Sequence, residues 1–179
     1  LEISREIGDR RAEGQDLGNL GIAYASLGQY EKAIDHYQQA LTIQREIGDR
    51  RGEGNQLGNL GIAYRNLGQV EKAIDYYQQA LAIQREIGDR RGEGQDLGNL
   101  GLAYADLGQV EKAIDHYQQA LDISREIGDR RNDGNQLGNL GNAYRNLGQD
   151  DNAIDYYQQP LPISREIGDR RGEGNRLGN

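Results

Sequence analysis

The string LGNLG occurs at residues 17–21, 57–61, 97–101 and 137–141, and its first three letters return at 177–179. The interval between successive copies is forty residues and never changes. A fixed period of this length is typical of repeat proteins, in which each repeat is one supersecondary unit that cannot bury its apolar face alone. The period therefore predicts an array of stacked units that share a core.

Each repeat contains two stretches in which apolar residues recur at helical intervals. In the repeat at 10–49, steps of three and four residues over 17–27 indicate one helix face, and a second stripe covers 30–47. Gly28-Gln29 separates the stripes, and Gly48-Asp49 follows the second as a predicted left-handed cap and N-cap. Because such short connections make successive helices antiparallel, the sequence predicts an all-α fold of helix pairs, helix A and then helix B.

The predicted organisation is a single repeat array over 1–179. Both ends fall within a repeat, so we expect a fragment of a longer array. The expected parts are a partial repeat at 1–9 (the end of a helix B), full repeats at 10–49, 50–89, 90–129 and 130–169, and a partial repeat at 170–179 (the start of a helix A). Pro160 and Pro162 lie inside the last helix B, and since proline clashes with the preceding turn, this helix is predicted to break near Pro160.

Glycines interrupt helix A at positions 14, 18 and 21 and recur in the later repeats. Each costs about 1 kcal/mol relative to alanine within a helix. We expect close approach of two helices to offset this cost, with Gly21 beside Ala33.

Composition excludes several classes of function. The net charge is -8, which argues against a general nucleic-acid or anionic-membrane binder, since phosphates are neutralised by clustered Lys and Arg. No apolar run could span a bilayer and no signal peptide opens the chain, so no membrane partner is predicted. Without cysteine there is no thiolate metal site, and a cytoplasmic location is expected.

The spacing of Leu20-Gly21, Tyr24, Gly28, Ala33, Tyr37 and Ala40 resembles the tetratricopeptide repeat (TPR) signature. Leu17 stands where the signature has tryptophan, and an extra turn replaces the usual proline after helix B. The forty-residue unit resembles the repeats of spindle-orientation adaptors, kinesin light chain and bacterial multi-repeat arrays. The resemblance implies a right-handed superhelical solenoid whose concave groove, lined by helix A, binds extended peptide segments.

The resemblance also implies which positions face that groove. Their spacing of i, i+4, i+7 and i+11 independently places them on one helix face. Most are amides, which can pair with both the N–H and the C=O of a peptide, although they could instead satisfy neighbouring helices. The positions are Gln15, Asn19, Ile22 and Ser26; Asn55, Asn59, Ile62 and Asn66; Gln95, Asn99, Leu102 and Asp106; and Asn135, Asn139, Asn142 and Asn146.

Charged residues in and beside the predicted groove bear on its selectivity. Arg65 and Arg145 flank the groove and would favour an acidic ligand, whereas Asp106 and Asp96 pull the other way. The arginine pairs at each repeat junction, such as Arg50-Arg51, could align into a phosphate-binding stripe, but adjacent acidic residues favour local pairing.

No catalytic, metal or cofactor site is predicted. His36 and His116 have no second ligand at metal spacing and are interpreted as surface or packing residues. Acidic pairs such as Glu31 and Asp35 recur in several repeats, whereas an active site is expected once.

Three functions are consistent with these features. The first is a scaffold that binds a peptide segment of a partner protein. The second is a structural array that self-associates head-to-tail through uncapped repeat ends, where Leu1, Ile3 and Ile7 lack a neighbour. The third is a sensor or spacer segment of a larger signalling protein.

Overall fold

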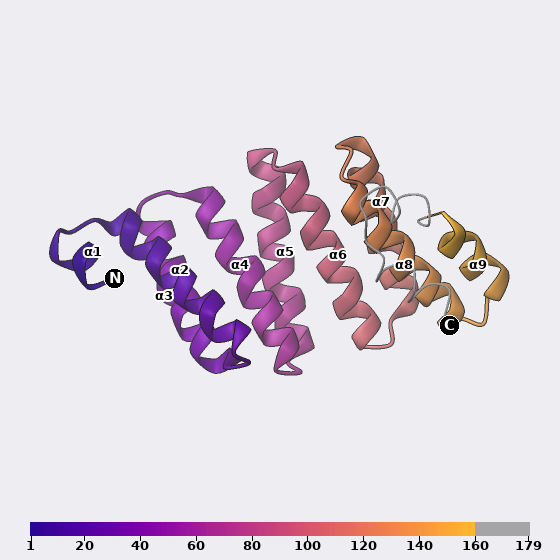
Figure 1. Ribbon diagram of the computed structural model, residues 1–179, viewed down its shortest axis with the longest axis horizontal. Coiled ribbons are helices and arrows are strands. Elements are labelled where there is room, and N and C mark those ends of the chain that lie inside the picture. Colours follow the sequence, from indigo (N-terminus) through magenta and orange to yellow (C-terminus); the bar gives the residue numbers. More distant parts are fainter. Residues whose placement is uncertain (160–179) are drawn as a thin grey trace. The chain divides into compact units, whose positions relative to one another are not determined.

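The computed structural model of the chain describes residues 1–159, and within them every regular element is a helix (Figure 1). The A helices are α2, α4, α6 and α8, and the B helices are α3, α5, α7 and α9, which confirms the predicted helix pairs. The bounds are α1 Glu2–Glu6, α2 Arg10–Ser26, α3 Tyr30–Glu46, α4 Arg50–Asn66, α5 Val70–Ile87, α6 Arg90–Asp106, α7 Val110–Glu126, α8 Arg130–Asn146 and α9 Asp150–Gln158.

Two predictions fall outside the described residues. Pro160 and Pro162, on which the expected break of the last helix B rests, both lie beyond residue 159. The predicted partial repeat at 170–179 also lies there.

The chain divides into two compact units, Leu1–Asp89 and Arg90–Asn179. Unit 1 contains α1 to α5, and the described part of unit 2 contains α6 to α9. Within each unit, successive helices pack against one another, and the A helices also touch, α2 against α4 and α6 against α8. The faces of two A helices are therefore direct neighbours in each unit.

The turns follow the predicted capping pattern. Gly48 has φ 69°, and the N–H of Asp49 donates to the carbonyl of Gln44 at 2.9 Å, which closes α3. The carboxylate of Asp49 then accepts from the N–H of Gly52 at 2.9 Å and caps α4. Both predicted roles, of Gly48 as a left-handed cap and of Asp49 as an N-cap, are confirmed.

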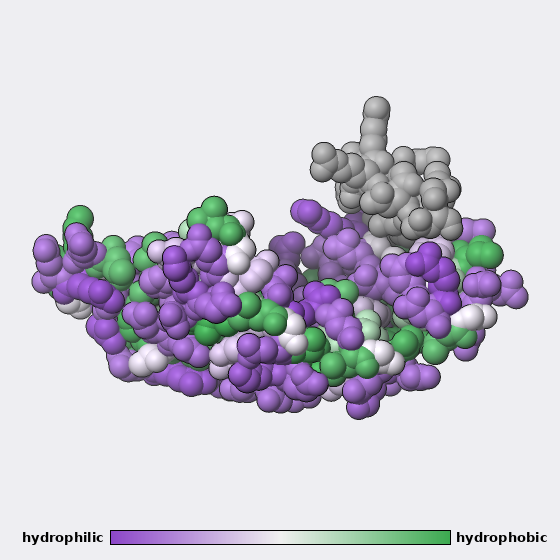
Figure 2. Space-filling view, turned by 90° about the horizontal axis from the view of Figure 1, so that it is seen from below, coloured by the Kyte–Doolittle hydropathy of each residue, from purple (hydrophilic) through white to green (hydrophobic). Residues whose placement is uncertain are grey.

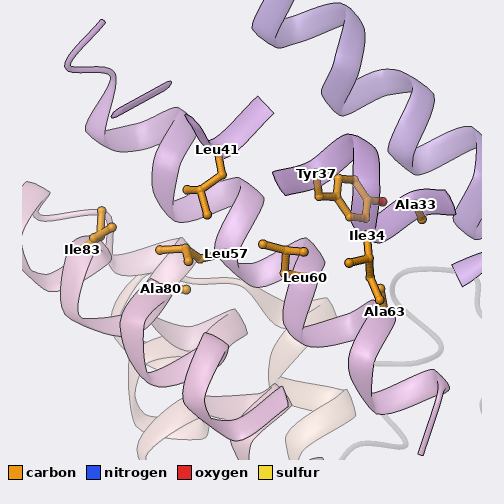
Figure 3. Close-up of a cluster of buried hydrophobic side chains, with 9 residues drawn as sticks. All are labelled: Ala33, Ile34, Tyr37, Leu41, Leu57, Leu60, Ala63, Ala80 and Ile83. Atoms are coloured by element: carbon orange, nitrogen blue, oxygen red, sulfur yellow. The ribbon is translucent and has the colours of Figure 1, made fainter. Parts of the chain in front are cut away.

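The apolar stripes of neighbouring helices meet in a buried core within each unit. In unit 1 (Figure 3), α3 contributes Ala33, Ile34, Tyr37 and Leu41, α4 contributes Leu57, Leu60 and Ala63, and α5 contributes Ala80 and Ile83. In unit 2 the corresponding cluster is Ala113, Tyr117, Leu121, Leu137, Leu140 and Ala143. The aromatic member of each cluster is a tyrosine, in a chain that has no Phe or Trp.

The glycines of helix A do allow a close approach, but the predicted partner was wrong. The atoms nearest to a Cβ added at Gly21 belong to the ring of Tyr37, and not to Ala33. At Gly61 the same Cβ would lie 2.5 Å from Cε1 of Tyr77, much closer than carbon atoms can approach. The glycine thus leaves room for a buried aromatic ring of helix B.

The face of the described residues seen in Figure 2 is mostly hydrophilic, with separate hydrophobic patches. Large apolar side chains that stay exposed include Ile22 and Ile62 on the A helices of unit 1. Within residues 1–159, no helix is both long and apolar enough to cross a membrane.

Candidate functional site

The predicted groove positions lie on an open face of the A helices. We call them the amide face of unit 1 (residues 15, 19, 22 and 26 on α2; 55, 59, 62 and 66 on α4) and the amide face of unit 2 (95, 99, 102 and 106 on α6; 135, 139, 142 and 146 on α8). Asn59, Asn99, Leu102 and Asn139 are half-buried, and the other twelve positions are exposed. Because α2 touches α4 and α6 touches α8, each face combines two neighbouring rows.

Several of these amides have no partner in the part of the chain that the structure describes. Within the described residues, no side-chain hydrogen bond engages Asn19, Asn55 or Asn59 in unit 1, nor Asn99 or Asn135 in unit 2. Their donors and acceptors are therefore available to pair with an incoming chain.

Other polar side chains of these faces are engaged locally. Asn66 donates through Nδ2 to the carbonyl of Ile62 at 2.8 Å, and Ser26 donates to the carbonyl of Ile22 at 2.9 Å. The Tyr157 hydroxyl donates to Oδ1 of Asn142 at 2.7 Å. Part of the set therefore forms hydrogen bonds within the protein, which is the alternative role that the sequence left open.

Apolar side chains interrupt the amides at the third position of three of the four rows. Ile22 is 50% exposed and Ile62 is 42% exposed, so unit 1 offers aliphatic surface beside Asn19 and Asn59. In unit 2 the same position holds the half-buried Leu102 on α6 and the polar Asn142 on α8. The two faces therefore differ in apolar character.

The charged residues Arg65, Arg145 and Asp106 do not give the groove a single sign of charge. Arg65 is half-buried, whereas Arg145 and Asp106 are exposed. Arg65 and Asp106 both interact with other groups of the protein, so neither charge is wholly available to a ligand. An acidic preference of the groove stays a prediction.

The arginine pairs at the repeat junctions are held by carboxylates of the protein. Glu53, only 6% exposed, accepts from Nε of Arg45 at 2.8 Å and from Arg50, which also binds Glu86. The same pattern joins Arg90 to Glu93 and Glu126, and Nη2 of Arg91 lies 3.3 Å from Oδ2 of Asp129. Pairing of these arginines with nearby carboxylates such as Glu53 and Glu93 is thus confirmed, and Glu86 and Glu126 at the far end of the same repeats add to it, which weakens the alternative of a phosphate-binding stripe.

We expect these ion pairs to make the melting temperature fall in acid. Arg5 and then Arg10 lower the pKa of Glu13 from its usual 4.5, and Arg50 and Arg90 likewise lower the pKa of Glu86 and of Glu126. A carboxyl whose pKa is depressed by folding stabilises the fold fully above its unfolded pKa, and this contribution is lost as the pH falls through the folded value. Circular dichroism melts from about pH 7 to about pH 3 would measure the decline.

One partly buried carboxyl works against this trend, and one variant serves as the control. Burial raises the pKa of Asp133, only partly opposed by Arg125, so its protonation in acid favours the fold. The variant Arg90→Gln releases Glu126 and should lose less stability between neutral and acid pH than the parent. A parent melting temperature that stays constant down to about pH 3 would contradict the expectation.

The histidines pack in the fold, as interpreted from the sequence. His36 stacks on Tyr24 with ring centroids 5.1 Å apart, and His116 meets Tyr104 edge-on at the same separation. In the other two repeats a tyrosine takes the histidine's place, and Tyr76 stacks on Tyr64 at 5.2 Å. Among residues 1–159, no cluster of His, Asp or Glu is arranged to hold a metal ion.

Sequence reasoning missed a pair of clefts that involve the B helices. One lies in unit 1 between α3 and α5, and the other lies in unit 2 between α7 and α9. The available signal was the alternation of His36 and His116 with Tyr76 and Tyr156, because both clefts occur at the tyrosine repeats. We call them the B-helix clefts.

Two models of one known family together match most of the chain. One model of the tetratricopeptide repeat matches residues 52–126 and 97–166, and a second model of this repeat matches residues 16–46. No curated protein matches the chain.

Solved structures share the fold at low sequence identity. Aspartyl phosphate phosphatase F from Bacillus subtilis superposes with a TM-score of 0.90 at 20% identity, over 94% of this chain and 44% of that one. The Rap conjugation gene regulator of plasmid pLS20, solved with the Phr* peptide, has a TM-score of 0.80 at 17% identity, over 92% of this chain and 45% of that one. A putative kinesin light chain of Podospora anserina with nearly identical TPR-like repeats has a TM-score of 0.72 at 23% identity, over 85% and 75%. The chain thus spans less than half of the first two proteins.

Proposed function

This chain belongs to the tetratricopeptide repeat family, and from that premise we propose that it is a protein-interaction scaffold. Its ligand is an extended peptide segment of a partner protein, which lies on the amide faces of the A helices. The observation that carries this proposal is the set of open amides, Asn19, Asn55 and Asn59 in unit 1 and Asn99 and Asn135 in unit 2.

The chemistry of these side chains suits the backbone of a peptide. An asparagine amide presents a donor and an acceptor together, so it can pair with both the N–H and the C=O of an extended chain. Ile22 and Ile62 add aliphatic contact between the amides of unit 1. The expected ligand therefore binds mainly through its backbone, with apolar side chains preferred opposite unit 1.

Proteins of similar fold lend support to a peptide ligand. The pLS20 regulator, which aligns with 92% of this chain, was solved in complex with a peptide. The role proposed here is binding without catalysis, in keeping with polar groups that recur in every repeat.

We expect the double variant Asn59→Ala/Asn99→Ala to bind peptides about thirtyfold more weakly than the parent. Each amide removed forfeits hydrogen bonds worth about 1 kcal/mol net, and the two residues lie in different units. A peptide-display selection on the parent would supply ligands, and fluorescence anisotropy would then compare their dissociation constants.

The matched control is Gln38→Ala/Gln78→Ala, which removes two exposed amides from the B helices instead. It should bind like the parent, and all three proteins should have equal helicity. If the parent enriches no peptide, or if both double variants bind equally, the proposed function is wrong.

A further inference from the structure

The two B-helix clefts are built from equivalent residues eighty positions apart. The cleft of unit 1 has a volume of about 400 Å³, and that of unit 2 about 330 Å³. Both are lined by a leucine, an arginine, an aspartate, a tyrosine and a glutamine at the same repeat positions. These are Leu41, Arg45, Asp75, Tyr76 and Gln79 in unit 1, and Leu121, Arg125, Asp155, Tyr156 and Gln159 in unit 2.

The arginine of each cleft is already engaged by the protein. Arg45 donates through Nε to Glu53 at 2.8 Å. Arg125 donates through Nη2 to Oε1 of Gln159 at 3.1 Å, and its Nε lies 3.6 Å from Oδ1 of Asp133. The charge of each cleft arginine is therefore largely compensated from within.

The aspartate of each cleft has no side-chain partner among residues 1–159. Within the described residues, neither the carboxylate of Asp75 nor that of Asp155 has a hydrogen bond or an ion pair. Both residues are exposed and lie one position before the cleft tyrosine. This carboxylate is the negative charge that each cleft offers to a ligand.

A tyrosine ring lines each cleft together with this carboxylate. Tyr76 stacks on Tyr64 at 5.2 Å, and Tyr156 stacks on Tyr144 at the same distance, so both rings are held in place. A guanidinium or ammonium group is attracted to the face of such a ring, and its aliphatic stem covers the neighbouring leucine. Carboxylate, ring and leucine together match a basic side chain.

The two clefts differ in the charges around this aspartate. Lys72 lines the cleft of unit 1, where its Nζ lies over the Tyr64 ring and donates to Gln69, whereas Asn152 takes this position in unit 2. In unit 2, Asp122 accepts from the cleft residue Gln118 at 3.0 Å and adds a second carboxylate nearby. The cleft of unit 2 is the more acidic one.

We propose that the B-helix clefts bind the basic side chains of a second partner segment, rich in arginine or lysine. The cation pairs with Asp75 or Asp155 and lies against the adjacent tyrosine. The net charge of -8 favours the approach of such a segment. No residue of the clefts belongs to the amide faces, so this inference stands independently of the proposed function.

The test uses an end-blocked peptide of alternating glycine and arginine, with the same peptide carrying neutral citrulline as reference. Binding to the full chain is followed by amide chemical shifts in NMR. The double variant Asp75→Asn/Asp155→Asn should bind the arginine peptide about tenfold more weakly, since a charge-assisted pair is lost in each cleft. Of the single variants, Asp155→Asn should lose more affinity than Asp75→Asn.

The matched control is Glu31→Gln/Glu111→Gln, which removes two exposed charges from B helices outside the clefts. This variant changes the net charge by the same amount as the cleft variant but leaves both clefts intact. It should therefore bind the arginine peptide within about twofold of the parent. Equal weakening of both double variants would show diffuse attraction to an acidic protein and would overturn the proposal. Equal affinity for the arginine and citrulline peptides, or no binding at all, would overturn it as well.

Discussion

Replacement of Tyr77 by alanine is expected to lower the free energy of unfolding by about 3–5 kcal/mol, the usual cost of deleting a buried aromatic ring. The Tyr77 side chain is 1% exposed, and its ring covers Gly61 of the preceding A helix. Gly61 has no side chain that could fill the space left when the Tyr77 ring is removed. Urea denaturation followed by far-ultraviolet circular dichroism would measure the loss.

The same contact predicts that Gly61→Ala destabilises the parent protein but stabilises the Tyr77→Ala variant. In the parent, the new Cβ would lie 2.5 Å from the Tyr77 ring, so overpacking of about 1–3 kcal/mol outweighs a helix-propensity gain of about 1 kcal/mol. In the Tyr77→Ala background the obstacle is gone, and the added methyl group should stabilise the helix by about 1 kcal/mol. A destabilising effect of equal size in both backgrounds would refute this account of the glycine.

The variant Gly52→Asn is expected to cost about 1–3 kcal/mol through overpacking at the junction of α3 and α4. A Cβ at Gly52 would lie 2.7 Å from Cδ and Oε1 of Gln44, whose side chain is only 3% exposed. Because Gln44 is confined, it cannot move aside without disturbing the core. Chemical denaturation of the full chain would measure the cost.

The equivalent junction in unit 2 supplies the compensating change. There Ser124 and Asn132 occupy the positions of Gln44 and Gly52, and Asn132 donates through Nδ2 to the Ser124 hydroxyl at 2.7 Å. The double variant Gln44→Ser/Gly52→Asn should therefore recover most of the stability lost in Gly52→Asn. Gln44→Ser alone leaves a cavity and serves as the control. Additive losses in the double variant would contradict the predicted pairing.

Much of the fold followed from local sequence pattern. The three- and four-residue steps over 17–27 and 30–47 predicted one helix pair, and the structure places α2 and α3 there. Gly48 and Asp49 predicted the cap between repeats, because a left-handed turn and an N-cap depend on residues adjacent in the chain. The acidic neighbours of Arg50 and Arg90 similarly predicted local ion pairs.

The candidate site was predictable in part. Helical spacing placed the groove positions on one face, and the structure leaves most of them exposed. Spacing could not tell that Asn142 accepts a bond from Tyr157 while Asn59 keeps its amide open, because such a bond depends on a side chain from the next helix.

The sequence by itself determined the helices, their order and their caps, since these depend on contacts within a few residues. The tertiary structure alone decided that Tyr37, and not Ala33, covers Gly21, that Gln44 requires Gly52, and that a cleft opens beside Tyr76. These features depend on the separation of helices and on the rotamers of side chains far apart in the chain. A periodic pattern predicts which helix face is buried, but the packing of the helices determines which atoms fill each space between them.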